Sequence, residues 1–178
     1  LRVGNGRAMQ VAVTGDRLLM IGIPSRGDLE RCQSLAKEWG ATNMDDMMWL
    51  GAISGHEHIC RLSKEWGATY WDGMLFSGAT GGHEHICRLA KEWGATAWDD
   101  MLRNAAIAGH EHLCRLAKEW GATCWNVALL NASFGGYESI CRLAKEWGAT
   151  DFDGMLRNAI VAKSENICKL AREWGARD

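Results

Sequence analysis

Residues 109–121, GHEHLCRLAKEWG, decide the fold, because near-copies of this stretch recur along the chain. Its Glu-Trp-Gly ending occurs six times, and each copy follows the previous one by 27 residues. The six tryptophans are Trp39, Trp66, Trp93, Trp120, Trp147 and Trp174. A constant interval of this length is typical of repeat proteins, in which each unit is one small supersecondary element.

The unit around this stretch has the pattern of two short helices. Leu102, Ala105 and Ala106 recur at the spacing of one helical face, and the acidic pair at residues 99–100 is interpreted as the N-cap. Gly109 is expected to end this first helix. A second helix follows, with the apolar residues of 113–117 facing inward, and Gly121 suits a left-handed C-cap.

Neither helix is long enough to be stable alone in water. Each pair must bury its apolar face against its neighbours, so we predict an all-α fold, an α-solenoid of stacked helix-turn-helix units. The predicted array covers residues 28–178. Residues 1–27 are interpreted as an atypical N-terminal cap, in which residues 7–16 form a diverged first helix. The array is expected to be truncated at its C-terminus, which leaves a self-stacking role for its ends open.

At this level of detail the unit resembles an ankyrin repeat. Residues 55–68, GHEHICRLSKEWGA, are similar to the second helix of that family, and residues 101–110, MLRNAAIAGH, to its first helix. The positions that agree are Leu102, Ala105, Ala106, Gly109 and His110. Ankyrin units have 33 residues, and the six missing ones fall where the family's β-hairpin finger projects. The resemblance therefore implies stacked helices without fingers, and a protein-binding role inside the cell.

Composition excludes several function classes. The net charge is −2, which argues against sequence-independent nucleic-acid binding. No apolar run approaches the roughly 18 residues of a membrane span. No nucleophile–base pair, phosphate loop or carboxylate dyad recurs in a consistent place, so the sequence predicts neither an enzyme nor a cofactor.

Cysteines and histidines recur in phase with the units. We expect the cysteines (Cys60, Cys87, Cys114, Cys141 and Cys168) to be small buried residues, because adjacent helices about 8–10 Å apart are too distant for disulfides within the column. The histidines occur as His-Glu-His triplets beginning at His56, His83 and His110. Two residues apart, they lack the spacing of a zinc peptidase motif, so we predict that the first one bonds the neighbouring turn and that no metal binds.

Two aromatic columns allow two interpretations. Besides the six tryptophans above, Trp71, Trp98, Trp125 and Phe152 recur in the turn before the first helix, with Met44 in the same column. We favour a structural role, in which the columns interleave and cover the edge exposed by the missing finger. The alternative is a solvent-facing aromatic strip that binds a ligand.

The first helices and turns vary from unit to unit, whereas the second helices are nearly copied. Exposed apolar and arginine side chains are typical of interface hot spots. We therefore predict a protein partner on the concave first-helix face; the candidate residues are Trp49, Phe76, Arg103, Leu130, Arg157, Ile53, Thr80, Ile107, Phe134 and Tyr70. Unconstrained drift would also produce such variation, and base-by-base nucleic-acid reading is the alternative binding mode.

Overall fold

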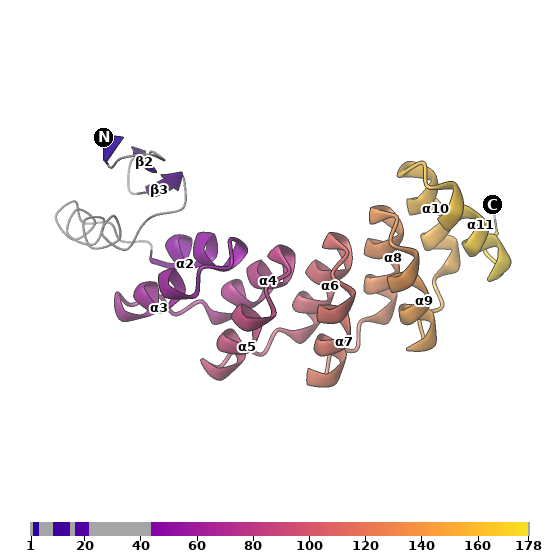
Figure 1. Ribbon diagram of the computed structural model, residues 1–178. Helices are drawn as coiled ribbons and strands as arrows, with labels where there is room; N and C mark the ends of the chain where they lie inside the picture. The colour runs from indigo at the N-terminus through magenta and orange to yellow at the C-terminus, as the bar shows by residue number, and fades with distance from the viewer. Residues whose placement is uncertain (1, 4–8, 15–16, 22–43, 178) are drawn as a thin grey trace.

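The computed structural model describes residues 2–3, 9–14, 17–21 and 44–177. The last of these segments is an unbroken series of helix pairs (Figure 1). The first helices of the pairs are α2 (Met44–Ile53), α4 (Trp71–Gly81), α6 (Trp98–Ala108), α8 (Trp125–Gly135) and α10 (Phe152–Val161). The second helices are α3 (Glu57–Glu65), α5 (Glu84–Glu92), α7 (Glu111–Trp120), α9 (Glu138–Glu146) and α11 (Glu165–Glu173). The predicted solenoid is confirmed.

Each first helix packs against its own second helix and against the first helix of the next unit. Contacts between successive second helices are sparser. Because the first helices approach one another more closely, the stack bends toward them, and in Figure 1 they line the concave, upper side of the arc. This geometry places the variable first helices on the hollow face.

One continuous apolar core runs through the stack from Met48 to Ala171. In the central unit Leu102, Ala105 and Ala106 of α6 are fully buried, as their spacing predicts. Leu113 and Cys114 of α7 meet them from the other side of the unit and are equally buried. The same positions are buried in neighbouring units, so the core is built by stacking rather than within any single helix pair.

The N-terminal region differs from the expectation. The described residues form a three-stranded antiparallel sheet of β1 (Arg2–Val3), β2 (Met9–Thr14) and β3 (Arg17–Ile21). The prediction of a diverged helix over residues 7–16 is therefore wrong for the part described. Val11 and Val13 alternate with other residues at the period of a strand, and β-branched side chains favour that conformation. Trp39 and the rest of residues 22–43 lie outside the described residues.

Glycines in left-handed conformations follow both helices in the first four described units, whereas in the last unit Lys163, with a φ of 57°, takes this place after α10. At the end of α4, Gly82 has a φ of 78°, and the N–H of His83 donates to the carbonyl of Gly78 at 2.9 Å. A Cβ at Gly82 would lie 2.7 Å from Cε1 of His110 in the next unit. Gly94, after α5, has a φ of 106° but no atom within 4 Å of such a Cβ.

Gly82→Ala is expected to lower the free energy of unfolding by about 1–3 kcal/mol more than Gly94→Ala. Both variants strain a left-handed residue, but only the first also pushes on the ring of the next unit. Chemical denaturation monitored by circular dichroism measures the difference. Equal losses in the two variants would show that the unit junction does not depend on this close approach.

Candidate interaction surface

All the candidate binding residues except Tyr70, which lies in the turn before α4, occupy two columns on one face of the first helices. Arg103 and Ile107 of α6 are four residues apart, as are Leu130 and Phe134 of α8, so each pair lies one turn apart on the same side. The other pairs of these columns are Trp49 with Ile53, Phe76 with Thr80, and Arg157 with Val161. The structure brings these residues into a stripe two side chains wide along the concave row.

Most large exposed apolar side chains gather on this stripe. Among the described residues, those that are exposed are Trp49 (43%), Tyr70 (54%), Ile107 (43%), Phe134 (51%), Ile160 (53%) and Val161 (70%). All six belong to the first helices or to the turn that precedes one. Exposed apolar groups concentrated on one face, instead of scattered singly, are typical of an interaction surface.

Not every candidate residue is freely exposed. Ile53, Phe76, Thr80 and Leu130 are partly buried. The Thr80 hydroxyl donates to the carbonyl of Phe76 at 2.9 Å, which ties it to its own helix. Ile160 was missed by sequence reasoning, because the corresponding residues of the other units are buried alanine or serine.

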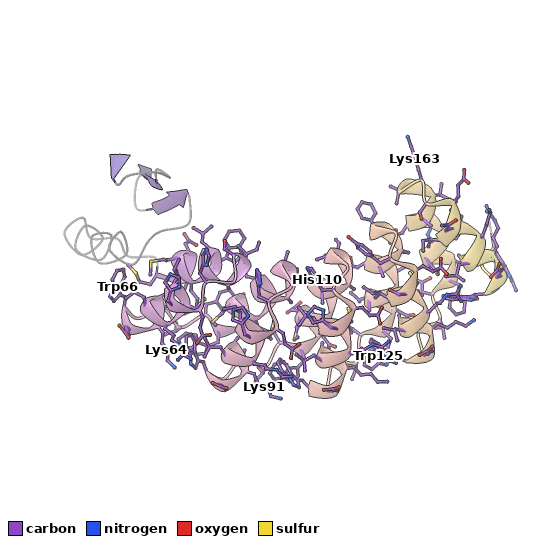
Figure 2. All side chains as sticks on the ribbon, in the orientation of Figure 1. Lys64, Trp66, Lys91, His110, Trp125 and Lys163 are labelled. Carbon is purple, nitrogen blue, oxygen red and sulfur yellow. The ribbon has the colours of Figure 1, made fainter. Side chains whose placement is uncertain are left out.

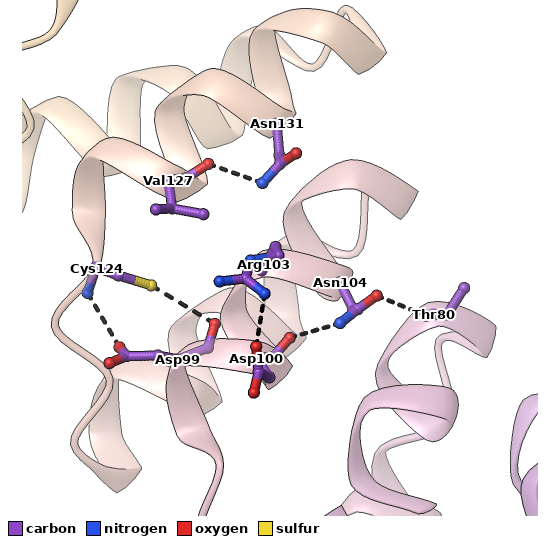
Figure 3. A network of polar contacts seen from close by, with 8 residues as sticks. All are labelled: Thr80, Asp99, Asp100, Arg103, Asn104, Cys124, Val127 and Asn131. Atoms are coloured by element: carbon purple, nitrogen blue, oxygen red, sulfur yellow. Dashed lines mark hydrogen bonds and ion pairs between the residues drawn. The ribbon is translucent and has the colours of Figure 1, made fainter. Parts of the chain in front are cut away.

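The two arginines of the stripe differ in their surroundings. Nη1 of Arg103 lies 2.7 Å from Oδ1 of Asp100 on the same helix (Figure 3). Arg157 occupies the same place in α10, but the residue three positions earlier is Gly154, which carries no charge. The Arg157 guanidinium therefore lacks this intrahelical ion pair.

Below the stripe, an acidic or amide side chain anchors each turn to the preceding first helix. Oδ1 of Asp99 accepts from the N–H group of Thr123 at 2.7 Å. It also accepts from the N–H group of Cys124 at 3.1 Å (Figure 3). Asp45, Asp72 and Asn126 make the same pair of bonds, and Asp153 accepts from the N–H of Arg177. The aspartates are thus junction residues inside the first helical turn, and their interpretation as N-caps is wrong: α6 begins at Trp98, after Ala97, which makes no side-chain cap bond.

Backbone hydrogen bonds, first that from Thr123, lower the pKa of Asp99. This carboxylate therefore stabilises the fold above the unfolded-state pKa of about 3.9, and its contribution is lost as the pH falls through the lower folded-state value. We expect Asp99→Ala to lower the free energy of unfolding by about 1 kcal/mol at neutral pH. Asp99→Asn should retain most of it, as Asn126 makes the same bonds, and should flatten the acid limb of a stability–pH curve. Equal losses for both variants would contradict this role.

The first histidine of the second and third triplets bonds the preceding unit, as predicted. Nε2 of His83 lies 3.2 Å from the carbonyl oxygen of Ile53, and Nε2 of His110 lies 3.1 Å from that of Thr80. No group of three or more potential metal ligands occurs within the described segments. The histidines thus join neighbouring units at the end of the first helices.

The cysteine column faces the core. Cys60, Cys87, Cys114 and Cys141 are buried free thiols, whereas Cys168 in the last unit is partly buried. Burial raises the pKa of Cys114 to about 12, so the thiol stays protonated and unreactive. These positions serve packing.

The two aromatic columns meet where the first helices begin and the second helices end, away from the histidines. Trp98 and Trp120 lie edge to face with ring centroids 5.3 Å apart, and Nζ of Lys91 from the preceding unit lies 4.4 Å from the Trp120 ring centroid. The same arrangement repeats at Trp71–Trp93, Trp125–Trp147 and Phe152–Trp174, each beneath a lysine. Sequence reasoning missed these lysines. All the rings are partly buried.

In comparisons with known proteins, no family model matches the chain and no curated protein matches it significantly. No helix in the described segments is both long and apolar enough to cross a bilayer. The class of protein that the geometry defines is a helical-repeat solenoid with a variable concave face.

Proposed function

We propose that the chain is a non-enzymatic scaffold of ankyrin-like type, which binds a protein partner on the concave first-helix face. One observation carries the proposal: exposed large apolar side chains gather on the first helices and turns, whereas the second helices display charged ones. A mixed apolar and arginine surface on a rigid repeat array is suited to protein recognition. The reduced, buried cysteines are in keeping with an intracellular setting.

The second helices provide a contrasting face. In four of the five described units, an exposed glutamate and arginine form an (i, i+4) ion pair on this side, for example Glu84 with Arg88 at 2.7 Å. Such pairs satisfy each other and contribute little net stability. This nearly invariant, internally neutralised surface offers fewer anchors than the first-helix face.

The test is an affinity pull-down with the triple variant Trp49→Ala/Phe76→Ala/Arg103→Ala. A partner of the wild-type chain should be lost, with binding weakened at least about 30-fold if the three residues include a hot spot worth 2 kcal/mol or more. The matched control is Arg61→Ala/Arg88→Ala/Arg115→Ala on the second helices, which should retain the partner. Circular dichroism verifies that both variants fold. A partner that persists in the first triple variant would refute the proposed face.

A further inference from the structure

The exposed apolar side chains of the stripe are concentrated in its C-terminal half, where three consecutive units each contribute one. The C-terminal rim, as we name it, consists of Ile107 on α6, Phe134 on α8 and Val161 on α10, which are 43%, 51% and 70% exposed. Ile107, Phe134 and Val161 occupy the same position of successive units. The corresponding residues nearer the N-terminus are the partly buried Ile53 and Thr80, so the rim is confined to these three units.

Charge is sparse around the rim, and the exposed acidic side chains nearest to it in the sequence of the last unit, Asp153 and Glu165, lie in the first turns of α10 and α11. The last turns of α6, α8 and α10 contain no charged residue. Arg157 and Lys163, both exposed, flank Val161, and neither forms an ion pair in the part of the chain that the structure describes. Lys163 projects at the upper edge of the last unit, on the concave side (Figure 2). A ligand that covers the rim would gain from a carboxylate at this end.

The periodicity of the rim restricts the shape of the occupant. Packed helices of neighbouring units lie about 8–10 Å apart, so the rim residues repeat at about that distance. An α-helix presents residues i and i+7 on one face about 10.5 Å apart. A β-strand offers about 6.7 Å or about 13 Å between residues on one face, and neither matches. A polyproline II segment repeats at about 9.3 Å and matches as well as a helix.

Backbone hydrogen bonding distinguishes the α-helix from the polyproline II segment as the occupant of the rim. The polyproline II backbone has no internal hydrogen bonds, so its amide and carbonyl groups must find partners when they are covered. The side chains of Ile107, Phe134 and Val161 neither donate nor accept. A helix satisfies its own backbone and can lie on such a surface without loss.

On the basis of the function proposed above, we infer that the C-terminal rim binds an amphipathic α-helix of the partner protein, with apolar residues seven apart and an acidic residue beside Arg157 and Lys163. The apolar side chains seat on Ile107, Phe134 and Val161 in turn. The acidic end sets the direction of the helix along the array.

The test uses a display library of random 20-residue peptides, selected on the full chain. Enrichment is compared with that on the Phe134→Gln/Val161→Gln variant, whose altered side chains are exposed and whose fold circular dichroism verifies. The expected peptides carry apolar residues seven apart with an acidic residue at one end, and gain helical circular dichroism on binding. Phe134→Gln should raise their Kd at least about tenfold, Lys163→Glu several-fold, and the control Arg115→Ala on α7, outside the stripe, less than about twofold.

Enriched peptides that contain proline or apolar residues at two- or three-residue spacing would overturn the inference. So would equal enrichment on the rim variant, or no enrichment at all. This failure is distinguishable from failure of the proposed function. If the triple variant of Trp49, Phe76 and Arg103 no longer binds a partner of the wild-type chain, the scaffold proposal stands even when no helical peptide is selected.

Discussion

Leu102→Ala is expected to lower the free energy of unfolding by about 3–5 kcal/mol. Leu102 lies on α6 at the centre of the array and is fully buried, and α6 itself packs against α7, α4 and α8. Removing its side chain leaves a cavity that stacked helices on both sides cannot close. Denaturant titration followed by circular dichroism measures the loss.

Ile107→Ala is the matched control, because Ile107 is on the same helix but 43% exposed. Its loss should stay below about 1 kcal/mol, since much of that side chain is already in water. A similar small loss at Leu102 would mean that the units do not share one core.

Trp93→Ala is expected to cost about 2–4 kcal/mol, somewhat less than a fully buried tryptophan. The substitution removes the edge-to-face contact with Trp71, whose centroid is 5.3 Å away, and the cation–π contact with Lys64 at 4.3 Å. These two contacts of the Trp93 ring therefore favour a structural role for the aromatic columns. Unfolding monitored by circular dichroism tests it.

Trp66→Ala should cost less, because the corresponding turn residue in that unit is Met44 instead of an aromatic ring. Equal losses at Trp66 and Trp93 would show that the ring pairs add nothing. A loss near zero at Trp93, together with loss of a partner, would support the solvent-facing strip.

The helices and their inward faces could be predicted because they depend on local spacing. Leu102 and Ala106 lie on one helical face whatever surrounds them, and Gly109 ends a helix by its own conformational freedom. The tryptophan interval then predicts stacking, since isolated pairs cannot bury their apolar residues.

Contacts between units could not be predicted in the same way. Asp99 bonds Thr123 and Cys124 across 24 and 25 residues, and Lys64 reaches a ring 29 residues away. These distances depend on how one unit sits on the next. The recurrence of an acid or amide at Asp45, Asp72, Asp99, Asn126 and Asp153 was the available signal, although it was attributed to capping.

The binding face was predictable in position but not in detail. Because their column varies from unit to unit, Ile107 and Phe134 were predicted as binding residues, and both are exposed. Ile160 gave no signal, because only the packing of the last unit shows that its position, buried elsewhere, is open there. The N-terminal strands were missed because short alternating stretches such as residues 9–14 are ambiguous between helix and strand.

Removing residues 95–121, one complete unit, tests most directly whether the repeats are interchangeable layers that depend on contact with their neighbours. The deletion rejoins Gly94 to Ala122 and restores the Gly-Ala junction of the remaining units. We expect a shorter helical protein with an unchanged shape of circular dichroism spectrum and cooperative thermal unfolding, whereas removing residues 109–121 alone should abolish the fold. Loss of helical structure after the 27-residue deletion would contradict this expectation.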